Sequence, residues 1–132
     1  MRSPERWKSF WAAVGLARDD RAMFEAKLHQ MSREQLVDLY HMYEEMIADL
    51  KGDDFMPYWG EHSEDFIDGA AHDIVAQGED YYLDVLEHPE FVARKLENVR
   101  HDRDDRGTIL RVYQKRFGEP LWKQLPRGQN QR

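Results

Sequence analysis

Apolar side chains recur along this chain at intervals of three and four residues, which places them on one face of an α-helix. The clearest case begins at Ser32, which can form a capping box with Gln35. From there an apolar face continues for about five turns until Gly52. Its members are Leu36, Leu39, Tyr40, Tyr43, Met46, Ile47 and Leu50. The pattern predicts a long helix between Ser32 and Gly52.

The same spacing favours helices along most of the remaining chain. Ser3 with Pro4, and later Ser63, are residues suited to helix starts, whereas Gly78 and Gly118 are suited to helix ends. The expected helices cover residues 3–14, 23–31, 32–51, 63–78, 79–87, 89–99 and 108–117. We therefore predict an all-α fold of about six helices in a single compact domain.

Length and composition support a folded domain. The 132 residues are 41% hydrophobic and include 4 Trp, 6 Tyr and 6 Phe, too many for a disordered chain. We predict that residues 1–125 form the domain and that residues 126–132 form a flexible tail. No apolar run approaches the roughly twenty residues that span a bilayer, and the chain does not start like a secretory signal. A cytoplasmic protein without a membrane partner is expected.

Charge is distributed very unevenly along the chain. Residues 52–93, called the acidic segment below, hold twelve carboxylates and no lysine or arginine. Residues 1–51 have a net charge of −1 (8 basic, 9 acidic) and residues 94–132 of +6 (11 basic, 5 acidic), so the −12 of the acidic segment exceeds the −7 of the whole chain. Such a segment attracts cations, either metal ions or a basic partner surface.

Four side chains of the acidic segment have the spacing of a possible metal site. Carboxylates and an imidazole separated by four, three and four residues fall on one stripe of a helix, where they could hold a divalent cation or act as a general base. A second element would have to contribute, and the nearest candidates are His41 and Glu45 on the long helix. The alternative interpretation is a solvated helix face. The four residues are Glu61, Asp65, Asp68 and His72.

Other catalytic chemistry is not expected. The chain has no cysteine, which excludes thiol catalysis and zinc-thiolate sites. Its few hydroxyl residues lie mostly at predicted helix starts, where capping explains them. No nucleophile elbow, phosphate loop or dinucleotide fingerprint occurs. The sequence therefore predicts no cofactor and favours a protein without catalysis.

Aromatic side chains gather in the predicted loop between residues 53 and 62. Phe55, Tyr58 and Trp59 lie there together with Met56. Aromatic residues of this kind can form a binding hot spot in a protein interface. The alternative is a loop whose rings close over the core. We select Tyr58 and Trp59 as candidate partner contacts.

The basic C-terminal third raises the question of nucleic-acid binding, because its arginines and lysines could contact phosphates. However, Asp102, Asp104 and Asp105 alternate with the arginines of the connection 100–107, and the neighbouring acidic segment repels phosphate. No recognised nucleic-acid motif occurs. A nucleic-acid partner is therefore not expected, and the basic third is interpreted as partly neutralising the acidic segment, within the fold or in a homo-oligomer.

Several short motifs occur in a shared order. Phe10-Trp11 is followed by Val14, the stretch from Ser63-Glu64-Asp65 leads to Ala76-Gln77-Gly78, residues 82–89 are acidic before a proline, and Val112-Tyr113-Gln114 leads to Gly118-Glu119. In these features the chain resembles an uncharacterised family of bacterial domains of unknown function, with an N-terminal Phe-Trp pair and a central Ser-Asp-Asp…Gln-Gly helix. Where that family has arginine and tryptophan in the central helix, this chain has Ala71 and Asp73. The resemblance implies a helical fold and no assigned activity.

These observations lead to one main functional hypothesis and two alternatives. The main hypothesis is an acidic, non-enzymatic helical protein that binds a basic protein partner, for example as an immunity or inhibitor protein. One alternative is a divalent-metal-binding domain or metal-dependent enzyme that uses the carboxylate and histidine stripe. The other is a homo-oligomer in which the acidic segment meets the basic third of another subunit. The predicted partner contacts are Tyr58, Trp59, Glu61, Asp65, Asp68 and Asp73.

Overall fold

The computed structural model describes residues 3–96 and 104–124, and this part of the chain contains helices and no strand. The all-α prediction is therefore confirmed. None of the helices in the described ranges is long and apolar enough to cross a membrane. The elements are α1 (Pro4–Asp19), α2 (Arg21–Gln30), α3 (Arg33–Asp49), α4 (Met56–Trp59), α5 (Glu64–Ala76), α6 (Glu79–Glu87), α7 (Phe91–Leu96), α8 (Asp105–Phe117) and the short 3-10 helix η1 (Leu121–Gln124).

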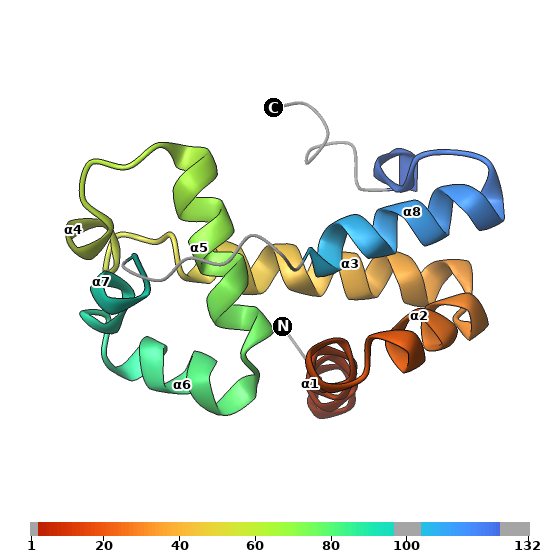
Figure 1. Cartoon of the computed structure of the whole chain (residues 1–132), viewed down its shortest axis with the longest axis horizontal. Helices are drawn as coiled ribbons and strands as arrows, with labels where there is room; N and C mark the ends of the chain where they lie inside the picture. Colours follow the sequence, from red (N-terminus) through yellow and green to blue (C-terminus); the bar gives the residue numbers. More distant parts are fainter. Residues whose placement is uncertain (1–2, 97–103, 125–132) are drawn as a thin grey trace.

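The long helix α3 runs along the longest axis of the molecule, and the other helices pack around it (Figure 1). Helix α8 lies along the N-terminal half of α3, and α1 and α2 cover another side. Helix α5 crosses the C-terminal end of α3. It forms, with α4, α6 and α7, the part of the molecule at the left of Figure 1, which we call the α4–α7 lobe. This lobe contains the acidic segment.

Side-chain caps fix three helix starts where the sequence predicts them, at Ser3, Ser32 and Ser63. The Ser32 hydroxyl accepts a hydrogen bond from the Gln35 amide (3.1 Å), and the Gln35 side chain accepts one from the Ser32 amide (2.8 Å), which confirms the capping box. Ser63 caps α5 in the same way by accepting from the Phe66 amide (3.1 Å). Helix α5 ends before Gly78, whose φ of 116° is open to glycine but strained for other residues.

Several elements differ from the sequence prediction. The last helix starts at Asp105 with Asp104 as its cap, not at Thr108, because the Asp104 carboxylate accepts from the Gly107 amide (2.9 Å). The predicted loop 53–62 contains the short helix α4. Helix α7 starts at Phe91, two residues after the predicted start at Pro89. Its predicted end near Val99 lies outside the described residues, and so does the predicted tail 126–132.

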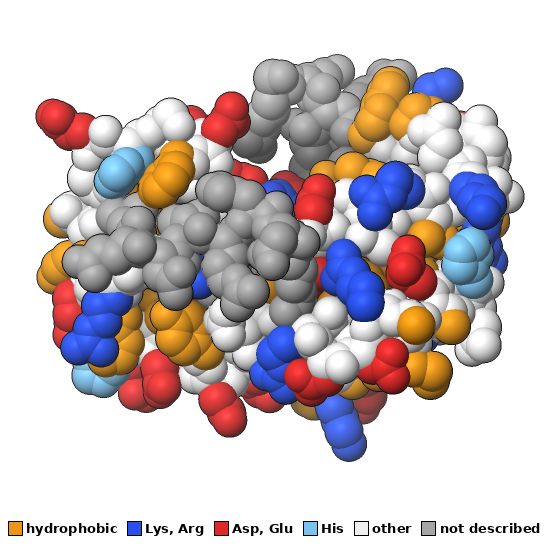
Figure 2. Space-filling view, in the orientation of Figure 1, with side chains coloured by type: hydrophobic (Ala, Val, Ile, Leu, Met, Phe, Trp, Pro, Cys, Tyr) orange, Lys and Arg blue, Asp and Glu red, His pale blue; other side chains and the backbone are white. Residues whose placement is uncertain are grey.

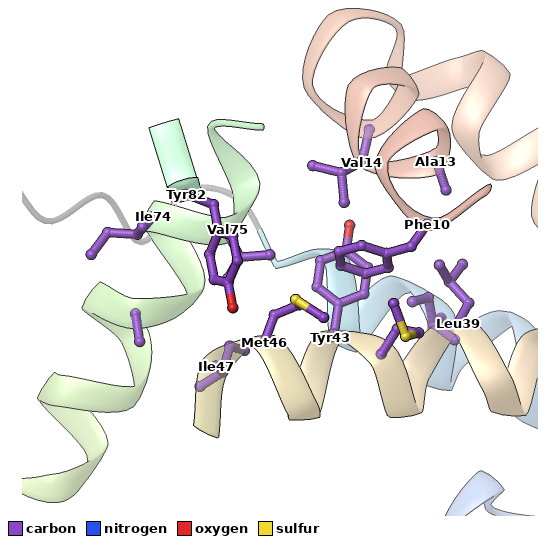
Figure 3. Packing of buried hydrophobic residues seen from close by; sticks show 14 of the residues in the cluster. Phe10, Ala13, Val14, Leu39, Tyr43, Met46, Ile47, Ile74, Val75 and Tyr82 are labelled. Carbon is purple, nitrogen blue, oxygen red and sulfur yellow. The ribbon is translucent and has the colours of Figure 1, made fainter. Parts of the chain in front are cut away.

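An aromatic cluster lies where α1, α3, α5 and α6 meet. The rings of Phe10 and Tyr43 are 5.0 Å apart between centroids, and those of Trp11 and Tyr82 are 5.3 Å apart. Figure 3 shows Phe10 and Val14 of α1 above Tyr43 and Met46 of α3. Because such large rings supply much of the buried apolar area, this cluster fixes the α4–α7 lobe against the rest of the molecule.

Candidate functional site

The acidic segment is sorted by the fold into an outward set and an inward set of carboxylates. Nine of its twelve carboxylates are exposed, Asp68 and Glu79 are half-buried, and Asp73 is buried. On the face shown in Figure 2, acidic side chains lie around the α4–α7 lobe, while most Lys and Arg side chains lie on the other half. The exposed members are Asp53, Asp54, Glu61, Glu64, Asp65, Asp80, Asp84, Glu87 and Glu90.

Asp68 points toward cations of the same chain. Its carboxylate accepts a hydrogen bond from the Arg106 guanidinium (2.5 Å) and lies 3.4 Å from the Lys51 ammonium. The same Arg106 also donates to Glu44 (2.7 Å) and so joins α3, α5 and α8. Burial opposes the charge on Asp68, but the hydrogen bond and charge of Arg106, supported by Lys51, outweigh it and hold its pKa below the usual range. Asp68 is thus engaged within the fold and is a poor contact for a partner.

Asp73 is buried, so its prediction as a partner contact is wrong. Its side chain is 6% exposed and forms an ion pair with Lys95 of α7, which is equally buried, at 3.6 Å. A partner contact at Asp73 would require this side of α5 to face solvent. Helix α5 is instead covered by α3 and α7, so that its second half is enclosed on several sides. A charge there requires a partner from the same chain.

The two aromatic candidates of α4 point in opposite directions. Tyr58 is 42% exposed and is available to a partner. Trp59 is 0% exposed, and its indole N–H donates to the Leu50 carbonyl (2.8 Å), so its prediction as a partner contact is wrong. Phe55 and Trp59 are four residues apart and lie on the inward side of this short helical turn. The loop therefore closes over the core with one half and presents the other half to solvent.

The predicted metal stripe is not brought together. Glu61 precedes α5 and is exposed together with Asp65, whereas Asp68 is engaged by Arg106 and His72 is buried. The first residues of the stripe lie at the surface and the last is buried, because the C-terminal half of α5 is covered by other helices. Within residues 3–96 and 104–124, no three His, Asp or Glu side chains are placed to hold a metal ion.

His72 instead lies beside a buried polar network. Its ring stacks on Tyr43 with centroids 5.8 Å apart and an angle of 18°, and it is 4% exposed. Its Nε2 atom has no hydrogen-bond partner among the described residues. Burial lowers the pKa of the imidazole below its ordinary value, although the charge of Asp105 acts in the opposite direction. The neutral form is therefore favoured.

Mild acidification is expected to destabilise the protein through His72. Its pKa in the folded state is below the ordinary value of 6.5, so the unfolded chain binds the proton more readily. The stability contributed by the neutral ring is present above that value and is lost as the pH falls toward the folded-state pKa. In urea unfolding at about pH 7.5 and about pH 5.5, His72→Phe should therefore lose less free energy of unfolding than the original chain. Equal losses in the two proteins would contradict this role.

Sequence reasoning missed Asp105, the most buried carboxylate among the residues that the structure describes. Its side chain is 0% exposed and accepts hydrogen bonds from the Tyr43 hydroxyl (2.8 Å) and the Arg21 guanidinium (2.6 Å). Arg21 also donates to the Thr108 hydroxyl (2.8 Å). The network joins α2, α3 and α8. The available signal was Asp104, which with Gly107 marks a helix start earlier than Thr108.

A hollow of about 80 Å³ lies beside α3, outside the acidic segment. It is smaller than the few hundred Å³ typical of ligand pockets. Its charged lining includes Arg6, which is held by Asp38 (2.7 Å) and Glu45 (3.2 Å). The hollow therefore gives no reason to move the candidate site away from the outward carboxylates.

The chain matches no protein-family model, no curated protein and no solved structure in comparisons with each. The resemblance to a family of bacterial domains thus stays a prediction, and function has to be argued from the surface itself.

Proposed function

We propose that this protein is a non-enzymatic binding protein whose acidic segment engages a basic protein partner. The observation that carries the proposal is the sorting of the carboxylates. The inward Asp68 and Asp73 are matched by Arg106, Lys51 and Lys95 of the same chain, whereas nine others face solvent in a segment without lysine or arginine. A surface of one sign attracts a partner of the opposite sign and accelerates its association.

The internal ion pairs explain why the negative charge of the outward carboxylates is not neutralised by the basic C-terminal third. Arg106 is half-buried, and Lys95 is 6% exposed. Both cations come from the basic C-terminal third, and both are used inside the fold. The prediction that the basic third neutralises the acidic segment thus applies to these inward members. For the outward members, the described ion pairs are long contacts, Glu64 with Lys51 (3.8 Å) and Glu90 with His88 (3.7 Å).

An immunity or inhibitor protein is the concrete form that we favour. An acidic protein surface and the phosphates of a nucleic acid both present repeated negative charges. An acidic surface can therefore cover a basic surface that otherwise binds nucleic acid. Such a protein needs a rigid frame and no catalytic residues. Glu61, Asp65 and Tyr58 are the predicted partner contacts that are exposed. Tyr58 lies on α4, Asp65 lies in the first turn of α5, and Glu61 lies in the connection between the two helices.

Charge reversal on the acidic segment is expected to weaken partner binding by at least about tenfold at low salt. Partners would be captured by cross-linking in extracts of the native cells, identified by mass spectrometry and then purified. Their affinity would be measured for the original chain and for two variants, Glu61→Lys/Asp65→Lys and Asp84→Lys/Glu87→Lys. All four residues are exposed, so the variants should fold. Raising the salt concentration should weaken binding of the original chain.

The matched control reverses two exposed carboxylates far from this segment, Glu25 on α2 and Glu34 on α3. Glu25→Lys/Glu34→Lys changes the net charge by the same amount, so it separates a local contact from a general effect of charge. The proposal fails if a specific partner binds equally well at low and high salt and to both acidic-segment variants. It also fails if the control variant weakens binding as much as they do.

A further inference from the structure

The outward face of α6 combines apolar and acidic side chains in two adjacent stripes. On a helix with 3.6 residues per turn, Leu83 and Leu86 lie one turn apart along one line. Both are partly exposed, at 40% and 36%. The carboxylates follow next around the helix. They are Asp80, Asp84 and Glu87, all of them exposed.

The opposite face of α6 is fixed firmly to the rest of the molecule. Tyr82 and Val85 are 0% exposed, and the Tyr82 hydroxyl donates to Asp49 (3.1 Å). At the start of the helix, the Trp7 indole N–H donates to Glu79 (2.6 Å). Contacts from α1, α3 and α5 thus hold α6 in one orientation. The outward face is therefore a rigid surface, and a partner would not have to order it on binding.

Within the described parts of the chain, neither leucine is covered, and no ion pair involves the three carboxylates of the outer stripe. An acidic stripe alone would attract any cation. Two leucines beside it add a contact that a simple cation cannot use, because only an apolar group gains from covering them. The surface therefore selects a partner with apolar and basic groups side by side.

We infer that the outward face of α6 is the docking surface for a basic amphipathic helix of the partner. This inference rests on the proposed function and names the partner's chemistry. The nine residues of α6 give a surface about 13 Å long, which matches two to three turns of a partner helix. Apolar residues of that helix cover Leu83 and Leu86, and its lysines or arginines reach the three carboxylates.

Leucine removal on α6 is expected to weaken binding of a basic amphipathic helix by about tenfold. The probe is a labelled 14-residue peptide of leucine and lysine with leucines at helical spacing, compared by fluorescence anisotropy with a scrambled peptide of the same composition. The original chain should bind the amphipathic peptide about tenfold more tightly than the scrambled one. Leu83→Ser/Leu86→Ser should abolish this difference without weakening binding of the scrambled peptide. Met23→Ser, at a side chain of α2 that is 54% exposed, is the control and should change neither affinity.

The outcomes separate this inference from the proposed function. Equal affinity for both peptides, or an unchanged preference in Leu83→Ser/Leu86→Ser, overturns the docking surface on α6. If the cellular partner is sensitive to Glu61→Lys/Asp65→Lys but not to Asp84→Lys/Glu87→Lys, the basic partner stands and its site is not α6. Self-association that increases with protein concentration and is abolished by Leu83→Ser/Leu86→Ser would show a second copy on this face and would also overturn the inference. Far-UV circular dichroism verifies that each variant is folded.

Discussion

Replacing Trp59 with alanine is expected to lower the free energy of unfolding by about 3–5 kcal/mol, one of the largest effects of any single substitution in this protein. The side chain is 0% exposed, so its removal leaves a cavity of the size of an indole ring. The Leu50 carbonyl would also lose the hydrogen bond from the indole N–H. Urea unfolding followed by far-UV circular dichroism measures the change.

The adjacent residue provides the matched control. Tyr58 is 42% exposed, and Tyr58→Ala should change the stability by less than about 0.5 kcal/mol. If Tyr58 contacts the partner, Tyr58→Ala weakens partner binding and leaves the free energy of unfolding unchanged. The main effect of Trp59→Ala is instead a loss of free energy of unfolding. Equal stability losses in the two variants would contradict the assignment of Trp59 to the core and Tyr58 to the surface.

The helices could be predicted because the signals that specify them are local. A capping serine and its partner are three residues apart, and an apolar stripe repeats within one turn. Ser32 with Gln35, and Ser63 before α5, were therefore identified correctly. Helix α4 was missed because a single turn containing Pro57 has too few residues to display a period.

The inward carboxylates could not be predicted, because their partners are distant in sequence. Arg106, which holds Asp68, is 38 residues away from it, and Lys95 reaches Asp73 from a different helix. Seen alone, α5 contains two carboxylates, Asp68 and Asp73, that would be expected to face solvent. Only Arg106 of α8 and Lys95 of α7 show that both are engaged within the same chain.

The orientations of the two aromatic neighbours of α4 also depend on a contact outside their own helix. Their composition indicated either a binding loop or a cover for the core, and the sequence contains nothing that assigns one role to each. The choice depends on the Leu50 carbonyl, which is left at the end of α3 and accepts the Trp59 indole N–H. A helix end has carbonyls without intrahelical partners, so a nearby indole is a suitable donor. This pairing turns Trp59 inward and Tyr58 outward.

Replacing Asp105 with alanine is expected to lower the free energy of unfolding by about 2–4 kcal/mol. The carboxylate is 0% exposed and accepts hydrogen bonds from Tyr43 and Arg21, so its loss removes an acceptor from both donors. Arg21 is 38% exposed and can turn toward water, which keeps the loss below that of a fully enclosed ion pair. Chemical denaturation measures the loss, and Asp80→Ala, at an exposed aspartate in the first turn of α6, should cost less than about 1 kcal/mol.

A double-mutant cycle with Tyr43 tests the reason for this loss. In Asp105→Ala the buried Tyr43 hydroxyl loses the carboxylate that accepts its hydrogen bond, whereas in Tyr43→Phe/Asp105→Ala that hydroxyl is absent as well. The double variant should therefore be more stable than the sum of the two single losses implies, by about 1–2 kcal/mol. Strict additivity would mean that the two groups do not interact. In that case the stability contributed by Asp105 would come from Arg21 and from its place in the first turn of α8.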